Sequence, residues 1–174
     1  MALDDEISGY IAVKHLLDMG HQDIIGIFTH SDRQGLLRYK GYMKALMELG
    51  LPIQENLVFW YSKENMQQIL NGAPLLKGLN KSTAALCYND SLALMLIDLL
   101  KEHGIRVPED FSVVEIDNCE MAGIRSLTTV VHPAEQLGKA SAKLLLSMMN
   151  GKEGKSILFP PELIVRNSVQ RMKG

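Results

Sequence analysis

The segment TAALCYND, from Thr83 to Asp90, and the segment PEDFSVVEIDN, from Pro108 to Asn118, decide the fold of this chain. Each is a short apolar run that ends abruptly in polar residues, which is typical of a strand buried on both faces of a parallel sheet. In such sheets, ligands bind just outside the carboxyl ends of the strands. The polar residues that end the two runs are therefore candidates for binding a small polar molecule.

Strand-like and helix-like segments alternate along the rest of the chain. This alternation, together with the continuous apolar character of the strands, predicts an α/β fold with a parallel sheet covered by helices on both faces. The expected strands are Ile24–Phe28, Leu57–Tyr61, Ala84–Tyr88, Phe111–Ile116, Leu127–Val131 and Leu163–Val165. The expected helices are Asp4–Met19, Leu37–Leu49, Asn65–Leu70, Ser91–His103 and Pro133–Met149.

The composition is ordinary for a globular protein. Of the 174 residues, 47% are hydrophobic and 22% are charged, and the 18 basic and 20 acidic residues include no basic stripe. The apolar runs are too short to cross a bilayer, and the first residues, MALDDEIS, lack the pattern of a signal peptide. Cys87 and Cys119 have no metal-binding spacing and favour a reducing compartment. These features predict a cytoplasmic protein without a structural metal.

Seven segments occur in an order that carries a family resemblance. They are GHQDIIGIF, RYKGYMKALMELGL, TAALCYND, GIRVPEDFSVVEIDN, LTTVVHP, LGKASAKLLL and ELIVRNSV. On these segments, from about Asp4 to about Val169, the chain resembles the effector-binding core of LacI/GalR-type bacterial transcriptional repressors. The segment SLTTVVHP, which ends at Pro133, is most similar to the arabinose-repressor branch of that family.

The resemblance implies a periplasmic-binding-protein-like fold, in which crossover strands join two similar subdomains and the ligand binds in the cleft between them. Residues 21–131 are then expected to form the C-terminal, effector-binding subdomain. Residues 1–20 and 132–150 are expected to supply helices of the N-terminal subdomain, and residues 151–174 a last strand and a tail. Because no match to the first units of that subdomain or to a helix-turn-helix is seen, the chain is expected to be a fragment.

The resemblance also implies which residues contact a sugar, since sugars are bound by planar polar groups that chelate neighbouring hydroxyls. Asp117 matches the family's strand-end aspartate, and Asn89 matches the asparagine of an Asn-Asp pair. Arg38 matches the arginine of the motif R-x-x-G-[YF]. The alternatives are a turn cap for Asp117 and a solvated helix arginine for Arg38. Asp90 is expected mainly to cap the helix that follows it.

Further residues are candidates with two interpretations each. Trp60, the single tryptophan, is either part of the core or a stacking platform for a sugar ring. His132 either donates to the ligand or satisfies a backbone carbonyl, and Arg33 is a weaker loop candidate. Glu115 departs from the family pattern, which has a small residue there, and Asn118 stands where a second acid is frequent.

No pattern indicates catalysis or cofactor binding. The five histidines are scattered, and no G-x-S-x-G, HExxH, Walker or GxGxxG motif occurs. The chain is therefore predicted to be neither an enzyme nor a cofactor-binding protein. The leading function is the effector-sensing domain of a sugar-responsive repressor, with L-arabinose or a similar sugar as the expected ligand. The alternatives are a periplasmic sugar-binding protein of a transport system and a flavodoxin-like enzyme or response module.

The predicted partners are a sugar effector, DNA only through a separate helix-turn-helix, a second copy of the chain, and no membrane. The helix Ser91–His103 is apolar nearly all round, so we expect a two-fold homodimer through Leu92, Leu94, Met95 and their neighbours. The chain alone is expected not to bind DNA usefully, because it has no groove-reading module and no cationic contacts to phosphate. It is expected not to bind sugar usefully, because only one wall of the cleft is encoded. The apolar faces Tyr10–Leu17 and Leu137–Met148 are expected to pack on each other, on a neighbouring chain, or in no fixed place.

Overall fold

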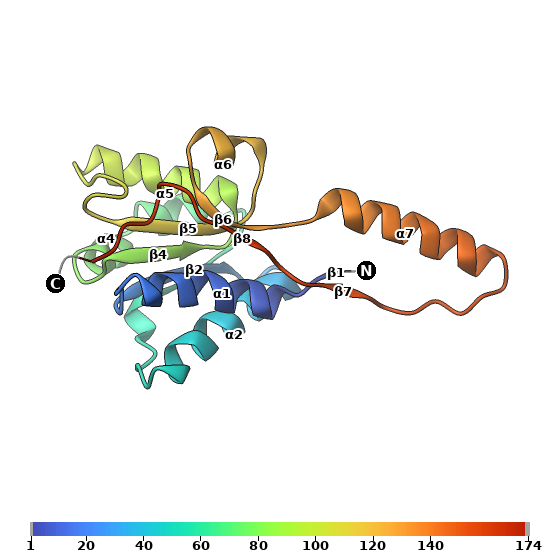
Figure 1. Cartoon of the computed structure of the whole chain (residues 1–174). Coiled ribbons are helices and arrows are strands. Elements are labelled where there is room, and N and C mark those ends of the chain that lie inside the picture. The colour runs from blue at the N-terminus through green and yellow to red at the C-terminus, as the bar shows by residue number, and fades with distance from the viewer. Residues whose placement is uncertain (1, 173–174) are drawn as a thin grey trace.

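The computed structural model describes residues 2–172 and has one six-stranded sheet at its centre (Figure 1). The strands are β2 (Ile24–Thr29), β3 (Val58–Tyr61, after the 3-10 turn Glu55–Leu57), β4 (Ala84–Cys87), β5 (Ser112–Asp117), β6 (Thr128–Val131) and β8 (Leu163–Ile164). Their order is β3-β2-β4-β5-β6-β8, in which β8 runs antiparallel to β6 and all other neighbours are parallel. The predicted α/β fold with a mainly parallel sheet is confirmed.

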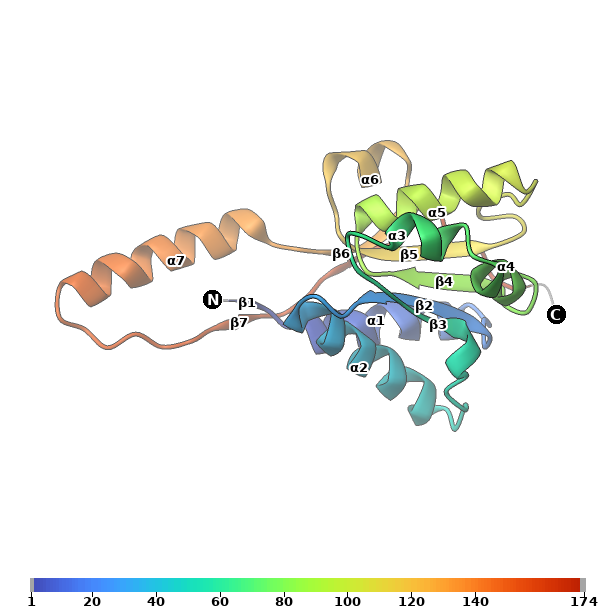
Figure 2. The ribbon, with the colours of Figure 1, turned by 180° about the vertical axis from the view of Figure 1, so that it is seen from behind.

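Helices cover both faces of the sheet (Figures 1 and 2). One face carries α1 (Asp5–Asp18) and α2 (Arg33–Glu48). The other carries α3 (Met66–Leu70), α4 (Ala73–Leu79), α5 (Asp90–Glu102) and the short α6 (Glu120–Ile124). The second helix begins at Arg33 rather than Leu37, because Asp32 caps it by accepting a hydrogen bond from the amide of Gly35 at 2.8 Å.

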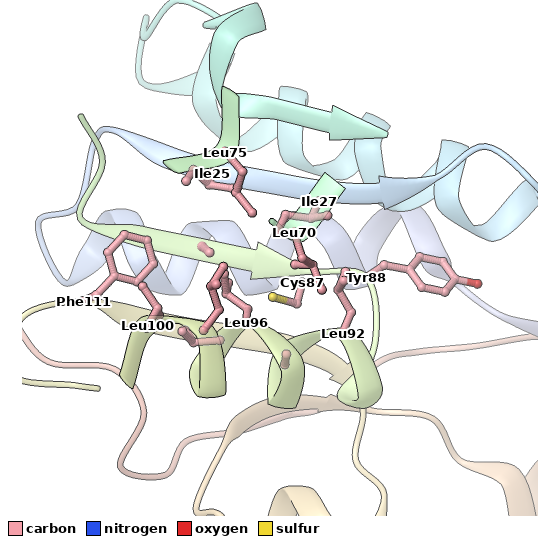
Figure 3. Close-up of a cluster of buried hydrophobic side chains, with 14 of the residues drawn as sticks. Ile25, Ile27, Leu70, Leu75, Cys87, Tyr88, Leu92, Leu96, Leu100 and Phe111 are labelled. Carbon is pink, nitrogen blue, oxygen red and sulfur yellow. The ribbon is translucent and has the colours of Figure 1, made fainter. Parts of the chain in front are cut away.

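Alternate residues of the strands pack into two separate apolar cores, one on each face of the sheet. Ile25 and Ile27 point towards α5, whereas Ile24 and Phe28 pack with α1 and α2. Figure 3 shows the first core, in which side chains of the sheet meet the buried leucines along α5. The strands are apolar almost throughout because both of their faces are covered.

The position of α1 corrects an expectation from the sequence. Residues 1–20 were expected to supply a helix of another subdomain, but α1 lies on the main sheet, with Ala12, Val13 and Leu16 fully buried in the second core. The close approach of α1 to α2 depends on glycine, since a Cβ on Gly9 would overlap the backbone carbonyl of Arg38. The apolar face Tyr10–Leu17 therefore has a complete packing partner in its own chain.

The last helix, α7 (Ala134–Met149), projects away from this body as an arm (Figures 1 and 2). None of its residues is buried, and Leu145, Leu146, Met148 and Met149 are all more than half exposed. The chain returns through β7 (Leu158–Phe159), which pairs in parallel with β1 (Ala2–Leu3). Within the described residues the apolar face of α7 has no packing partner, as expected, whereas that of α1 has one.

Candidate ligand-binding site

The carboxyl ends of β4 and β5 lie side by side, and Arg38 reaches them from α2. Its Nε donates to Asp5 Oδ1 at 2.9 Å, its Nη2 donates to Asp117 Oδ1 at 3.0 Å, and its Nη1 donates to the carbonyl oxygen of Tyr88. The Arg38 side chain is only 1% exposed. The structure therefore brings Arg38 and Asp117 together as predicted. Arg38 is not a solvated side chain but is buried and hydrogen-bonded to Asp5, Tyr88 and Asp117.

Two carboxylates compensate the buried charge of Arg38. Burial disfavours the guanidinium cation, yet Asp117 and Asp5 together raise the pKa of Arg38 above its ordinary value. Burial also raises the pKa of Asp117, and the Arg38 guanidinium offsets part of that shift. A buried charge of this kind persists only where its partners and hydrogen bonds are well placed. The cluster is thus a pre-organised set of charges at the carboxyl edge of the sheet.

Asp117 remains accessible although one of its oxygens is engaged. Its side chain is 34% exposed, and among residues 2–172 no hydrogen bond reaches its second oxygen. His132 lies next to it: the His132 amide donates to the Asp117 carbonyl at 3.1 Å, and Nδ1 of the ring is 3.8 Å from Oδ1. Asp117 can therefore accept hydrogen bonds from a ligand while Arg38 holds its other oxygen.

Asn89, and not Asp90, caps α5. Asn89 is the helix cap, since its extended backbone precedes α5 and its side-chain oxygen accepts from the amide of Leu92 at 3.1 Å. Asp90 instead accepts from the amide of Cys119 at 2.9 Å and so ties the loop after β5 to α5. The expectation that Asp90 caps the helix is wrong, and the amide nitrogen of Asn89 and one lone pair of its oxygen are left for a ligand.

Trp60 lies apart from this cluster. It packs against Phe28 and Tyr39, at ring-centroid distances of 5.7 and 5.1 Å, and β2 and β4 separate its strand from β5. The aromatic ring of the cluster is that of Tyr88, over which the Cζ of Arg38 lies at 4.5 Å from the ring centroid, with Tyr61 beside it. The structure favours the core interpretation of Trp60.

Three residues of the cluster were not predicted. Asp5 stands in the first turn of α1, 33 positions from Arg38, and no local signal marks their pairing. Tyr88 extends beyond the end of β4 (Figure 3), and its hydroxyl donates to Asp32 Oδ2 at 2.7 Å. Arg166 donates from Nη2 to Asn118 Oδ1 at 2.7 Å. Tyr88 had a usable signal, because it directly precedes the Asn-Asp pair at a strand end.

A cavity of about 770 Å³ adjoins the cluster between the body and the arm. Asp5, Arg33 and His132 line it on the side of the body, and Leu137 and Leu158 line it on the side of the arm. Its volume is in the range of small-molecule sites. No group of three or more potential metal ligands occurs among the described residues. None of the helices within residues 2–172 has the length and apolarity that crossing a bilayer requires.

Comparison with known proteins identifies the family. The profile of the family described as "Periplasmic binding protein-like domain" matches residues 13–169. The chain is 36% identical to the arabinose metabolism transcriptional repressor of Halalkalibacterium halodurans, over 99% of this chain and 49% of that protein. It is 34% identical to the transcriptional repressor PurR of Vibrio campbellii, over 97% of this chain and 52% of that protein.

A solved structure supports the same assignment. The LacI family transcriptional regulator of Enterococcus faecium, solved with bound ribose, superimposes with a TM-score of 0.85 at 32% identity, over 98% of this chain and 65% of that one. The chain spans about half the length of the curated relatives it matches. These relatives are named as transcriptional regulators, and none of them is named as an enzyme. The chain belongs to the periplasmic binding protein-like domain family, in the form found in LacI-type transcriptional repressors.

Proposed function

We propose that this chain forms an effector-sensing part of a cytoplasmic, sugar-responsive transcriptional repressor, and that its ligand is L-arabinose or a similar pentose. The observation that carries the proposal is the buried Arg38, which holds Asp5 and Asp117 at the carboxyl edge of the sheet. The names of two relatives, an arabinose metabolism repressor and a regulator solved with ribose, support a pentose. DNA binding would belong to another part of a longer protein.

The chemistry of the cluster suits a polyol. Ionised carboxylates only accept hydrogen bonds, so the accessible oxygen of Asp117 pairs with a hydroxyl donor, while the amide of Asn89 and the ring of His132 offer donors to hydroxyl oxygens. A site built in this way rejects analogues that lack a hydroxyl, because its own polar groups would be left unpaired. In this proposal Arg38 positions Asp117 and does not itself touch the sugar.

Chemical-shift mapping tests the proposal. The ¹⁵N-labelled chain is titrated with millimolar L-arabinose, and amide shifts are expected to concentrate at Asn89, Asp117, Asn118 and His132. The Asp117→Asn variant should lose these shifts, whereas Asp110→Asn, which changes an aspartate paired with the exposed Arg106, should keep them. Scattered shifts, or the same shifts with glycerol, would count against a sugar site.

We further propose that the repressor is a homodimer that associates through α5 and α6. The expectation that Leu92 takes part in this contact is wrong, because its side chain is fully buried in the first core. Leu94 and Met95 are only partly buried against that core. Met121 and Ile124 of α6, which are 42% and 66% exposed, extend the same surface. Light scattering should give a dimer for the wild type and a monomer for Met95→Glu. A wild-type chain that is already monomeric would remove this proposal.

A further inference from the structure

The end of β5 has an unusual backbone. Asp117 and Asn118 are consecutive non-glycine residues with positive φ angles, of 130° and 62°. Such conformations are sparsely populated by residues that carry a side chain, and they persist only where the surroundings impose them. The turn also bears the most accessible carboxylate of the proposed site. Something in the structure must therefore hold this turn.

Arg166 holds the second residue of the turn, as Arg38 holds the first. Its Nη2 donates to Asn118 Oδ1 at 2.7 Å, and its Nη1 donates to the carbonyl oxygen of Leu127 at 2.6 Å. Its own amide donates to Thr128 Oγ1 at 3.0 Å. One guanidinium thus bridges the two ends of the loop that leaves β5 and enters β6.

The position of Arg166 is itself well defined. It follows β8 closely, and β8 pairs with β6 through Val130 opposite Leu163 and Thr129 opposite Ile164. The next residue, Asn167, donates its amide to the carbonyl of Ser126 at 3.0 Å. The C-terminal segment is therefore fastened to the same loop at several points, and the arginine side chain is anchored before it reaches Asn118.

We propose that Arg166 is a positioning residue of the effector site: it holds Asn118 in its left-handed conformation and thereby sets the direction of the Asp117 carboxylate. This inference rests on the proposed sugar-binding function for its consequence on affinity, but not for its effect on the turn. The planar fork of arginine serves two acceptors at fixed separation, which a lysine ammonium on a flexible stem does not reproduce.

Hydrogen exchange tests the effect on the turn without any ligand. The amide of Cys119 donates to Asp90 and the amide of His132 donates to Asp117, so both report on the geometry of the turn. In Arg166→Gln, exchange at these two amides should be at least about tenfold faster, with the central strands unchanged. The control Arg106→Gln, which alters an arginine that is 69% exposed, should leave both amides unchanged. Unchanged exchange in Arg166→Gln would overturn the proposal.

Arg166→Lys covers the case in which the glutamine variant does not fold. It keeps the charge but not the fork, and its exchange at Cys119 and His132 should lie between that of the wild type and that of Arg166→Gln. If both variants instead speed exchange throughout the sheet, Arg166 is a general stability residue and the positioning role is refuted.

Sugar affinity then links the turn to the site. Relative to the wild type, Arg166→Gln and Asn118→Ala should each weaken L-arabinose binding by about tenfold, and the double variant should be little weaker than either, since both act through one contact. Additive losses would contradict action through Asn118. If the wild type does not respond to arabinose while Arg166→Gln still loosens the turn, the proposed sugar function fails and the positioning role stands.

Discussion

At Glu115, a carboxyl group is completely buried on the α5 face of the sheet, between Cys87 and Thr129 on the neighbouring strands. Within the described residues neither oxygen has a hydrogen-bond partner, and burial raises the pKa of Glu115 to about 9. In the folded protein the carboxyl of Glu115 is therefore neutral at pH values at which the same carboxyl is already ionised in the unfolded chain. Glu115 also contributes to raising the pKa of the buried thiol of Cys87, after the larger effect of burial.

A loss of stability with rising pH follows from this residue. The unfolded carboxyl releases its proton above its ordinary pKa, whereas the folded one keeps it until about pH 9, so unfolding is favoured progressively across that interval. Glu115→Gln should flatten the dependence and raise the free energy of unfolding near neutral pH by on the order of 1–3 kcal/mol. Urea unfolding at several pH values measures this. An equal slope in Glu115→Gln and in the exposed control Glu120→Gln would contradict it.

Arg38 should be far more important for stability than a surface arginine. Its removal leaves the carboxyl of Asp5, which is 5% exposed, without its compensating charge. Arg38→Ala is expected to cost about 3–5 kcal/mol in the free energy of unfolding, whereas the exposed Arg106→Ala should cost less than about 1 kcal/mol. Chemical denaturation of both variants gives the comparison. Similar losses in the two would show that the Arg38 cluster contributes little.

Some of these residues could be found from the sequence and others could not. Asp117 and Asn89 stand at strand ends, and the ends of parallel strands meet at one edge, so a strand-end rule places them together. The pairing of Asp5 with Arg38 depends on how two helices cross, which no local pattern encodes. The capping role of Asn89 was missed because Asn and Asp are both good helix caps, and the backbone geometry decides between them.

At the scale of elements, the crossing of α1 and α2 depends on residues without side chains. A Cβ at Gly9 would overlap the backbone of Arg38, and one at Gly41 would overlap the backbone of α1. Gly9→Ala should therefore destabilise the fold by about 1–3 kcal/mol or more, because the helices must separate. Gly138→Ala, in α7 with open space around it, should be neutral or stabilising by up to about 1 kcal/mol. The midpoints of thermal unfolding of the two variants test this prediction. Equal midpoints would contradict the requirement for glycine where α1 crosses α2.

The five parallel strands and the long helices could be predicted because their apolar patterns are continuous and their ends are marked by glycine, proline or capping residues. The helical periodicity of residues 4–19 predicted α1 correctly but carried no information about which sheet it covers. The short elements β1, β7 and α6 had too few residues for any periodicity to show. Their existence depends on contacts between segments distant in the sequence.

At the scale of the whole molecule, most of the polar side chains that line the cavity come from the body. The body contributes Asp5, Arg33 and His132 beside the apolar Ile7 and Leu37, whereas the arm contributes Leu137, Leu158 and one polar residue, Ser156. A sugar would leave many of its hydroxyls without protein partners, at about 1 kcal/mol net for each hydrogen bond not formed. Calorimetry of the 174-residue chain with L-arabinose should therefore give a dissociation constant weaker than micromolar. A micromolar value would show that this chain contains the complete site.

The length of the α7 arm has a geometric consequence. Its 16 helical residues extend over about 24 Å at 1.5 Å per residue. The helix is connected to the body through His132 and Pro133, and the His132 amide donates a hydrogen bond to the carbonyl of Asp117. A rotation of roughly 10° at that point displaces the far tip of the helix by about 4 Å, while the atoms beside the carboxylate shift by only a fraction of that distance. Any change of angle at His132 and Pro133 would therefore displace the tip of α7 much further than the atoms beside Asp117, within the limit set by the pairing of β7 with β1.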